Sequence, residues 1–349
     1  MHTATANLWT DRVIACVNAR LSEFFATKRD ESDALSPRAR ELVDAVAALT
    51  MRGGKRLRSL AVYAGLSAVN RDAADLDVGI ALSIEVAAAI ELLQSYLLIQ
   101  DDWMDDDEER RGGPSVHAAL SVAHGPKLGA SLAILAGDMA VGFAFELLHR
   151  AKFPISHAAA ARSAFDAMHF EVICGQQLDL LEHDDVTLTH HLKTGSYTVR
   201  GPLKLGALLG GASDAQLLAI ERFGRPLGIA FQLRDDLLGT FGDSRATGKP
   251  AGHDLREGKN TALVAQARAI MEGEARAQLE RVLGRRDASA SELRDATRTL
   301  EASGARARVE AQLDSQLSEA EQALSNASLL PVGVDMLRHL LGKIALRDR

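Results

Sequence analysis

The stretch from Val78 to Gln100, VGIALSIEVAAAIELLQSYLLIQ, decides the fold class of this chain. It is long enough and apolar enough to raise the question of a membrane span. Glu85 and Glu91 lie inside it, however, and carboxylates are costly near the middle of a bilayer. The segment is therefore predicted to form a buried helix in the core of a globular protein.

The rest of the chain has the composition of a helical protein. Alanine, leucine, arginine and glutamate dominate the 349 residues, aromatic residues make up 4%, and period-two runs of valine and threonine are scarce. Glycine and proline pairs such as Gly53-Gly54 and Gly201-Pro202 divide it into segments suited to helices of several turns. We expect an all-α fold in which residues 1–349 form a single domain. A polar loop is predicted over Lys28 to Ser36, with Ser36-Pro37 opening the second helix.

The net charge and the cysteine content indicate which partners and which cellular compartment the protein is suited to. The net charge of −7 gives no reason to expect nucleic acid or an anionic membrane surface as partner. Cys16 and Cys174 form neither a disulfide framework nor a metal-binding spacing, which favours a reducing compartment. The N-terminus, with Asp11, Arg12 and Arg20, has no apolar core of the signal-peptide type. These features predict a cytoplasmic protein without a transmembrane segment.

An acidic run, DDWMDDDEE, begins at Asp101 directly after the apolar segment. On a continuing helix Asp101 and Asp105 share one face with Asp102 beside them. Like charges at this spacing repel, and carboxylates at a helix C-terminus oppose the macrodipole. Mg²⁺ would offset this repulsion, because it prefers oxygen ligands and binds one or two carboxylates together with substrate phosphates. A solvated acidic helix end is the alternative; Arg110 and Arg111 count against it, since paired guanidiniums suit forked contacts with phosphate.

A second acidic pair, Asp235-Asp236, lies in the apolar sequence FQLRDDLL from Phe231 to Leu238. Taken alone, it fits a metal site and a buried ion-pair network equally well. Two Asp-rich helical segments that face each other across a cavity would form a metal clamp for a diphosphate.

Two further segments carry basic residues. Gly53-Gly54-Lys55-Arg56-Leu57-Arg58 suits a phosphate-binding turn at the start of a helix, although it lacks the spacing of a nucleotide P-loop. A basic surface turn is the alternative. The pair Lys193-Thr194 is common by chance and indicates nothing by itself.

In this order the segments resemble the trans-prenyl (polyprenyl) diphosphate synthase family of the short-chain type. The resemblance covers about residues 40–280, and it also includes Gly175-Gln176-Gln177-Leu178-Asp179. It implies a helical bundle of the isoprenoid synthase type around a deep central cavity, usually as a homodimer. Such enzymes use Mg²⁺ to condense an allylic diphosphate (dimethylallyl, geranyl or farnesyl) with isopentenyl diphosphate, releasing diphosphate.

The resemblance also implies a role for each matching residue. The implied metal ligands are Asp101, Asp102, Asp105, Asp235 and Asp236. The allylic diphosphate would be held by Arg110, Lys193 and Lys249, with Lys259 nearby. The diphosphate of isopentenyl diphosphate would be held by Lys55, Arg58 and Arg111, with Gln94 where many members have histidine. Thr194 and Gln232 would face the carbocation, so the residues implied in catalysis are Asp101, Lys193, Thr194, Gln232 and Asp235.

Two positions bear on metal affinity and product length. Gly239 stands where the family often has a third aspartate, which predicts weaker metal binding rather than inactivity. In the family, two bulky aromatic residues before the first Asp-rich motif go with a farnesyl product, and one with a geranylgeranyl product. Tyr96 beside Leu97 favours geranylgeranyl diphosphate, with farnesyl diphosphate as the alternative. A floor formed instead by Met139 or Phe143 on a neighbouring helix remains open.

Three other functions compete with this interpretation. A terpene cyclase of the same helical class would not need the basic residues from Lys55 to Arg58, and its Asn-x-x-x-Ser/Thr-x-x-x-Glu motif is not seen at the second acidic pair. A non-catalytic partner subunit would tolerate loss of the aspartates and lysines. A purely structural helical protein would leave the repelling carboxylates unexplained.

Overall fold

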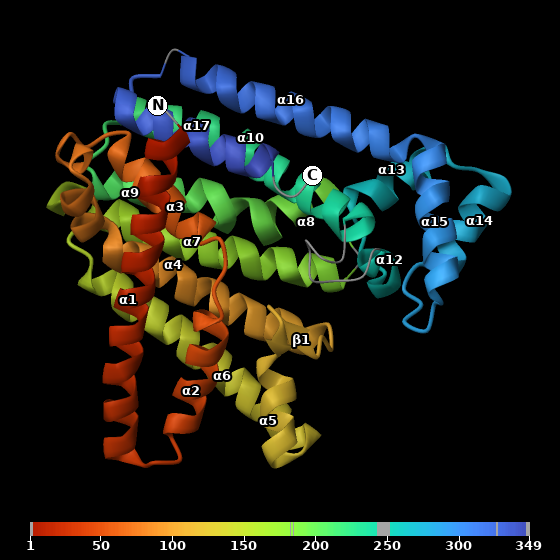
Figure 1. Cartoon of the computed structure of the whole chain (residues 1–349), viewed down its shortest axis with the longest axis horizontal. Coiled ribbons are helices and arrows are strands. Elements are labelled where there is room, and N and C mark those ends of the chain that lie inside the picture. The colour runs from red at the N-terminus through yellow and green to blue at the C-terminus, as the bar shows by residue number, and fades with distance from the viewer. Residues whose placement is uncertain (1–2, 182, 184, 243–251, 326, 347–349) are drawn as a thin grey trace. The chain divides into compact units, whose positions relative to one another are not determined.

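The computed structural model describes residues 3–181, 183, 185–242, 252–325 and 327–346 (Figure 1). Over these residues the fold is all-α, as predicted, apart from a short hairpin of β1 (Glu109–Arg110) and β2 (Gly113–Pro114). The chain forms two compact units, which are described separately. Unit 1 comprises Met1–Ala164, Pro202–Leu217 and Leu329–Leu337, and unit 2 comprises Phe165–Gly201, Leu218–Ser328 and Arg338–Arg349. The single domain over 1–349 stays a prediction.

Unit 1 is built on two long helices that pack against each other, α4 and α6. Its elements are α1 (Thr3–Leu35), α2 (Arg40–Met51), α3 (Leu57–Ser67), η1 (Asp72–Ala74), α4 (Leu76–Met104), the hairpin, α5 (Val116–His124), α6 (Pro126–Arg150) and most of α9 (Gly201–Leu209). Figure 1 shows α1 and α2 in red and orange; both contact α4 or α6 as well as each other. Helix α4 therefore has neighbours on several sides.

Unit 2 holds the C-terminal helices. Its elements are α8 (Val186–His190), η2 (His191–Arg200), α12 (His253–Glu257), α13 (Ala262–Ile270), α14 (Gly273–Val282), α15 (Ala290–Ser303) and α16 (Ala305–Ser325). Among the described helices, α9 and three others contribute residues to both units; the three others are α7 (Ile155–Leu180), α10 (Asp214–Phe241) and α17 (Pro331–Ala345). One apolar cluster joins α13, α14 and α15, and a second joins α10, α13 and α16.

Helix α4 is the predicted core helix. Its middle residues are buried, and both of its inner carboxylates are paired: Glu85 accepts hydrogen bonds from Arg20 at 2.8 and 3.0 Å, and Glu91 pairs with Arg56. The ion pairs explain how an apolar helix carries two acidic residues in a folded protein. Among the described helices, only α6 is long and apolar enough to cross a membrane by length and composition, and core helices can meet the same criterion.

The N-terminal prediction needs two corrections. Helix α1 continues to Leu35, so the segment from Lys28 is helical rather than a loop. Lys28 is held on that helix by ion pairs with Glu31 at 2.6 Å and Glu146 at 2.7 Å. The second helix begins at Arg40, because residues 37–39 form a turn after Ser36. The polar composition predicts a loop, whereas ion pairs stabilise about two further turns of helix here.

Candidate active site

The first Asp-rich motif lies at the C-terminus of α4, as predicted. Asp101 and Asp102 are on the last turn, and Asp105 is the C-cap residue, whose N–H donates to the carbonyl of Asp101 at 2.8 Å. This hydrogen bond keeps Asp101 and Asp105 one turn apart on the same face. Asp101 and Asp105 are half-buried, and Asp102 is fully buried.

Arg110 lies on β1, and its guanidinium is close to three carboxylates of the acidic motif. Its guanidinium donates to Asp102 Oδ1 from Nε at 2.6 Å and to Asp107 Oδ2 at 3.2 Å, and lies 3.7 Å from Asp101. Burial raises the pKa of the Asp102 carboxyl to about 6, although Arg110 acts in the opposite direction. Arg110, which is predicted to bind phosphate, thus forms ion pairs with the predicted metal ligands. A bound cation would compete with Arg110 for these carboxylates.

The basic turn before α3 is the predicted helix start. Its glycines have φ of 93° and 132°, which glycine tolerates and other residues rarely adopt. Arg56 follows in the left-handed region, turns inward and forms an ion pair with Glu91 at 2.9 Å, whereas Lys55 is exposed. The cations of this motif therefore have different environments: Arg56 is buried in the core, and Lys55 is exposed.

Arg58 and Arg111 come together beside this turn. A Cβ at Gly54 would lie 3.7 Å from the guanidinium carbon of Arg111, so this side chain covers the glycine. Burial lowers the pKa of Arg111, and the positive charges of Arg56, Arg58 and Arg110 add to that effect. Two segments far apart in the sequence thus concentrate guanidinium groups, which suits a polyanionic ligand.

The hairpin that carries Arg110 is held by Arg52, which sequence reasoning missed. Its Nη1 donates to the carbonyls of Arg110 at 3.1 Å and Pro114 at 2.6 Å. Arg52 ends the helix before the basic turn, so it ties that turn to the hairpin of the acidic motif. A lone arginine among many is not distinguishable from a surface residue in the sequence.

Lys193 and Thr194 lie in unit 2 on η2, a π-helical segment; such segments are often found at functional sites. Lys193 Nζ forms an ion pair with Asp179 Oδ2 at 2.6 Å, and a Cβ at Gly175 would lie 2.3 Å from the backbone nitrogen of Lys193. Gly175 and Asp179 are the glycine and aspartate of the Gly-Gln-x-x-Asp element. The element therefore serves to bring α7 against the lysine.

The second Asp-rich motif lies on α10, and its two carboxylates differ. Asp235 is half-buried, whereas Asp236 is 2% exposed. Asp236 accepts hydrogen bonds from Gln232 Nε2 and from the backbone N–H of Ala262, both at 2.7 Å. Burial raises the pKa of Asp236, opposed by these two donors and by the nearby His190 and Lys259. The pair is thus one accessible and one enclosed carboxylate.

At Gly239 another carboxylate fills the place of the absent third aspartate side chain. A Cβ built on Gly239 would lie 1.8 Å from Asp254 Oδ2, so no side chain fits there while Asp254 keeps its position. Lys259 follows closely, and its backbone N–H donates to the carbonyl of Asp254 at 3.0 Å. Lys249, predicted as a diphosphate ligand, lies outside the described residues.

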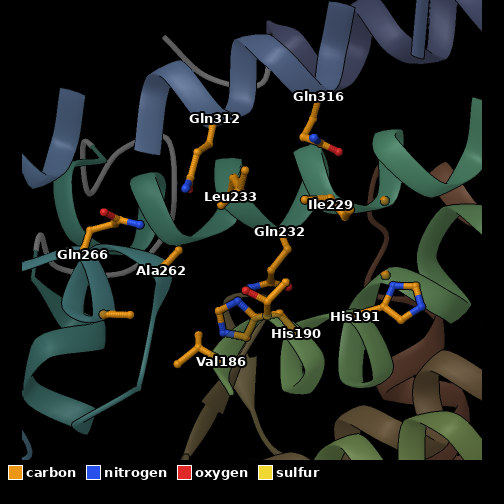
Figure 2. Close-up of a pocket in the computed structure, with 14 residues that line it drawn as sticks. Val186, His190, His191, Ile229, Gln232, Leu233, Ala262, Gln266, Gln312 and Gln316 are labelled. Atoms are coloured by element: carbon orange, nitrogen blue, oxygen red, sulfur yellow. The ribbon is translucent and has the colours of Figure 1, made fainter. Parts of the chain in front are cut away.

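A cavity of about 300 Å³ lies in unit 2 between α8, η2, α10, α13 and α16 (Figure 2). Its polar lining includes Gln232 from α10, His190 at the end of α8, Gln266 from α13, and Gln312 and Gln316 from α16. Gly195, next to Thr194, also lines it. Of the two residues predicted to face a carbocation, Gln232 therefore lines the cavity itself. Thr194 is next to a lining residue, Gly195.

The model of the polyprenyl synthetase family matches residues 39–300. The short chain isoprenyl diphosphate synthase of Methanocaldococcus jannaschii is 30% identical over 290 residues, covering 81% of this chain and 81% of that protein.

The chain belongs to the polyprenyl synthetase family.

It is therefore a prenyltransferase, as predicted. The geranylgeranyl diphosphate synthase of Methanosarcina mazei is 34% identical over 290 residues, covering 81% of this chain and 80% of that one. The fold agrees with a crystal structure of geranylgeranyl pyrophosphate synthase from Corynebacterium glutamicum complexed with isoprenyl diphosphate and magnesium. That structure has a TM-score of 0.89 and 32% identity, with coverage of 97% of this chain and 99% of that chain.

The donor set of this polyprenyl synthetase fits a hard divalent cation. Asp102 Oδ2 is buried with no hydrogen-bond partner among the described residues, and Asp101 and Asp105 supply further oxygens on the same helix end. Oxygen is the ligand that Mg²⁺ prefers. Over the described ranges, however, no group of three or more His, Cys, Asp or Glu residues is suited to hold a metal by itself. One or two carboxylates with diphosphate oxygens would complete the coordination.

The residues predicted to set product length lie on α4. Tyr96 and Leu97 are half-buried, as is Gln94 two turns before Asp101. Burial raises the pKa of Tyr96, and the negative charge of Asp138 on α6 acts in the same direction. Phe143 of α6 instead packs edge-to-face on Phe24 of α1, with ring centroids 5.3 Å apart.

Proposed function

We propose that this polyprenyl synthetase condenses an allylic diphosphate with isopentenyl diphosphate, head to tail, in a Mg²⁺-dependent reaction that releases diphosphate. The observation that carries the proposal is the concentration of guanidinium groups from Arg58 and Arg111 next to the buried carboxylates that Arg110 gathers. An anion-binding cluster beside an oxygen-rich cluster is what two diphosphates and a divalent cation require.

The carboxylates of both Asp-rich motifs would hold the cation. In the first motif these are Asp101, Asp102 and Asp105, and in the second the predicted ligands are Asp235 and Asp236. When bound, Mg²⁺ supplies Lewis-acid stabilisation of the charge that develops on the departing diphosphate. Arg110 would then share Asp102 with the cation or turn toward the phosphate, since its guanidinium is already within reach of three carboxylates.

Basic side chains would hold each diphosphate separately. Lys193 would bind the allylic diphosphate together with Arg110, Lys249 and Lys259, exchanging its ion pair with Asp179 for the phosphate. Lys55, Arg58 and Arg111 would bind the diphosphate of isopentenyl diphosphate, with Gln94 nearby. Two sites for two similar anions place the reacting carbons at a fixed separation, which lowers the entropic cost of the condensation.

The carbocation formed on ionisation would lie near Thr194 and Gln232. Their side-chain oxygens present the negative ends of dipoles to a developing positive charge. The apolar neighbours of Gln232 on α10, Ile229 and Leu233, exclude water that would otherwise quench the cation. No strong base is needed, because the released diphosphate can accept the proton.

The proposed product is geranylgeranyl diphosphate. Tyr96 is the one aromatic residue of the pair before Asp101, and Phe143 packs edge-to-face on Phe24 of α1. The names of the relatives support this choice, since those from Methanosarcina mazei and Sulfolobus acidocaldarius are geranylgeranyl diphosphate synthases. Farnesyl diphosphate is the second candidate, because a relative from Geobacillus stearothermophilus is a farnesyl diphosphate synthase.

A cytoplasmic homodimer is the proposed form of the enzyme. Helices α5 and α6 expose large apolar side chains: Val122 at 91%, Leu128 at 51% and Leu135 at 52%. Large exposed apolar side chains are common at protein–protein interfaces. A second copy of the chain would bury them, and sedimentation equilibrium would test it.

The deciding experiment is an assay of the purified chain. Isopentenyl diphosphate is incubated with dimethylallyl, geranyl or farnesyl diphosphate in the presence of Mg²⁺, and the products are identified by mass. Elongated prenyl diphosphates whose formation stops with excess chelator are expected. Cyclic hydrocarbons from a single diphosphate would indicate a cyclase instead, and full activity in chelator would refute the metal dependence.

A further inference from the structure

The two aspartates of the second motif have different environments in unit 2. Both oxygens of Asp236 are engaged: Oδ1 accepts from Gln232 Nε2 and Oδ2 from the backbone N–H of Ala262, both at 2.7 Å. His190 Nδ1 lies 3.7 Å from the same Oδ2. Asp236 is 2% exposed, whereas the adjacent Asp235 is half-buried.

We propose that Asp236 is a positioning residue that fixes the orientation of the Gln232 carboxamide, which leaves the half-buried Asp235 as the metal ligand that the proposed function requires of this pair. The inference refines the proposed function above and rests on it. It changes the role of Asp236 from metal ligand to hydrogen-bond acceptor.

The orientation follows from the chemistry of the acceptor. An ionised carboxylate only accepts hydrogen bonds, so the NH₂ end of the Gln232 carboxamide must face Asp236. The carbonyl oxygen is the opposite end of that group, and Gln232 lines the cavity (Figure 2). A carbonyl oxygen stabilises a developing cation, whereas a flipped carboxamide would present N–H donors to it.

Asp236 is also fixed on its other side. Ala262 is the first residue of α13, and its N–H is one of the amides that a helix start leaves without an intrahelical acceptor. Thr261 caps the same helix by accepting from Val264 at 3.3 Å. Each oxygen of Asp236 thus already accepts a hydrogen bond from a buried donor, and the side chain is only 2% exposed, so Asp235 is the more accessible carboxylate of the pair for a metal.

The test exchanges the donor and the acceptor, and the double variant does so while keeping the net charge. The variants are Asp236→Asn, Gln232→Glu and the double variant. In Asp236→Asn the new amide satisfies one donor only, so turnover at saturating substrates should fall about tenfold to a hundredfold. In the double variant the asparagine at 236 donates to the glutamate at 232 and still accepts from Ala262, so turnover should recover to within a few fold of wild type.

Metal binding is measured without turnover, as Mn²⁺ binding in the presence of inorganic diphosphate by calorimetry. Asp235→Asn is the matched control and should weaken it at least tenfold, whereas Asp236→Asn should leave it unchanged. Urea denaturation reports whether each variant folds. The proposal is overturned if Asp236→Asn weakens Mn²⁺ binding as much as Asp235→Asn, if its turnover is unchanged, or if the double variant fails to recover. A wild-type chain that makes no prenyl diphosphate would refute the proposed function instead, and the binding comparison would still stand.

Discussion

Arg56 and Glu91 form an ion pair of 2.9 Å in which both side chains are 2% exposed. Arg56 also donates to the carbonyl of Thr50 at 2.8 Å, and Glu91 accepts from the hydroxyl of Ser59 at 2.9 Å. This network fixes the left-handed residue of the basic turn, so a carboxylate in the middle of α4 holds the residue next to Lys55, the proposed ligand of isopentenyl diphosphate.

Glu91→Gln should destabilise the protein by about 3–5 kcal/mol, because it leaves the buried guanidinium of Arg56 without a counter-charge. The KM for isopentenyl diphosphate should rise as well. Glu85→Gln is the matched control, since its partner Arg20 is partly exposed, and it should cost no more than about 1 kcal/mol. Urea denaturation gives both values, and equal losses in the two variants would argue against a special role for the buried pair.

Restoring the third aspartate should harm the enzyme. In Gly239→Asp the new Cβ would overlap Asp254 Oδ2, which lies 1.8 Å from that position, so the stability should fall by about 1–3 kcal/mol. Mn²⁺ binding should not tighten. Combining it with Asp254→Gly opens the space and should recover the stability. A Gly239→Asp variant that folds as well as wild type and binds metal more tightly would contradict this account.

Metal affinity should depend on pH through Asp102, whose carboxyl has a pKa of about 6 because of its burial. A metal binds the ionised carboxylate, so affinity should fall as the pH is lowered below about 6. The pKa of Asp102 lies above the ordinary value of 3.8. Between pH 3.8 and about 6 the folded, metal-free protein therefore carries a proton on Asp102 that the unfolded chain has lost. The resulting stability is present at low pH and lost as the pH rises through 6. Calorimetric titrations across this range measure the affinity, and Asp102→Asn should abolish the dependence.

The two diphosphate sites should respond separately to loss of a lysine. Lys193→Ala should chiefly impair the allylic substrate or its ionisation, and Lys55→Ala should chiefly raise the KM for isopentenyl diphosphate. Each lost charge-assisted contact corresponds to about 1.5–3 kcal/mol. Asp179→Asn controls for the ion pair, because it removes this pair while keeping Lys193. Equal damage to both substrates in both lysine variants would refute the assignment.

Product length should depend on Tyr96. Tyr96→Ala removes the ring about one turn before Asp101, and products longer by one or more five-carbon units are expected. Phe143→Ala is the control, since Phe143 packs on Phe24, and it should leave the product spectrum unchanged. Mass analysis of the products shows whether Tyr96 or Phe143 limits the product length. If only Phe143→Ala lengthens the product, α6 forms the floor.

The all-α fold, the core position of α4 and the two Asp-rich helix segments could all be predicted from the sequence alone. Composition and the spacing of charges along one helix are local properties, so they can be read without knowing which segments meet. The error over Lys28 to Ser36 has the same origin. Glu146, which pairs with Lys28, is distant in sequence, and its contribution to the helix cannot be inferred locally.

Which charged groups are paired with other side chains inside the protein could be known only once the helices were in place. Arg56 looks like its neighbours in the basic turn, but Glu91 draws it into the core; Asp236 looks like Asp235, but Gln232 and Ala262 enclose it. The physical reason is that burial and partners set the free energy of an ionised group, and both depend on segments far apart in the chain.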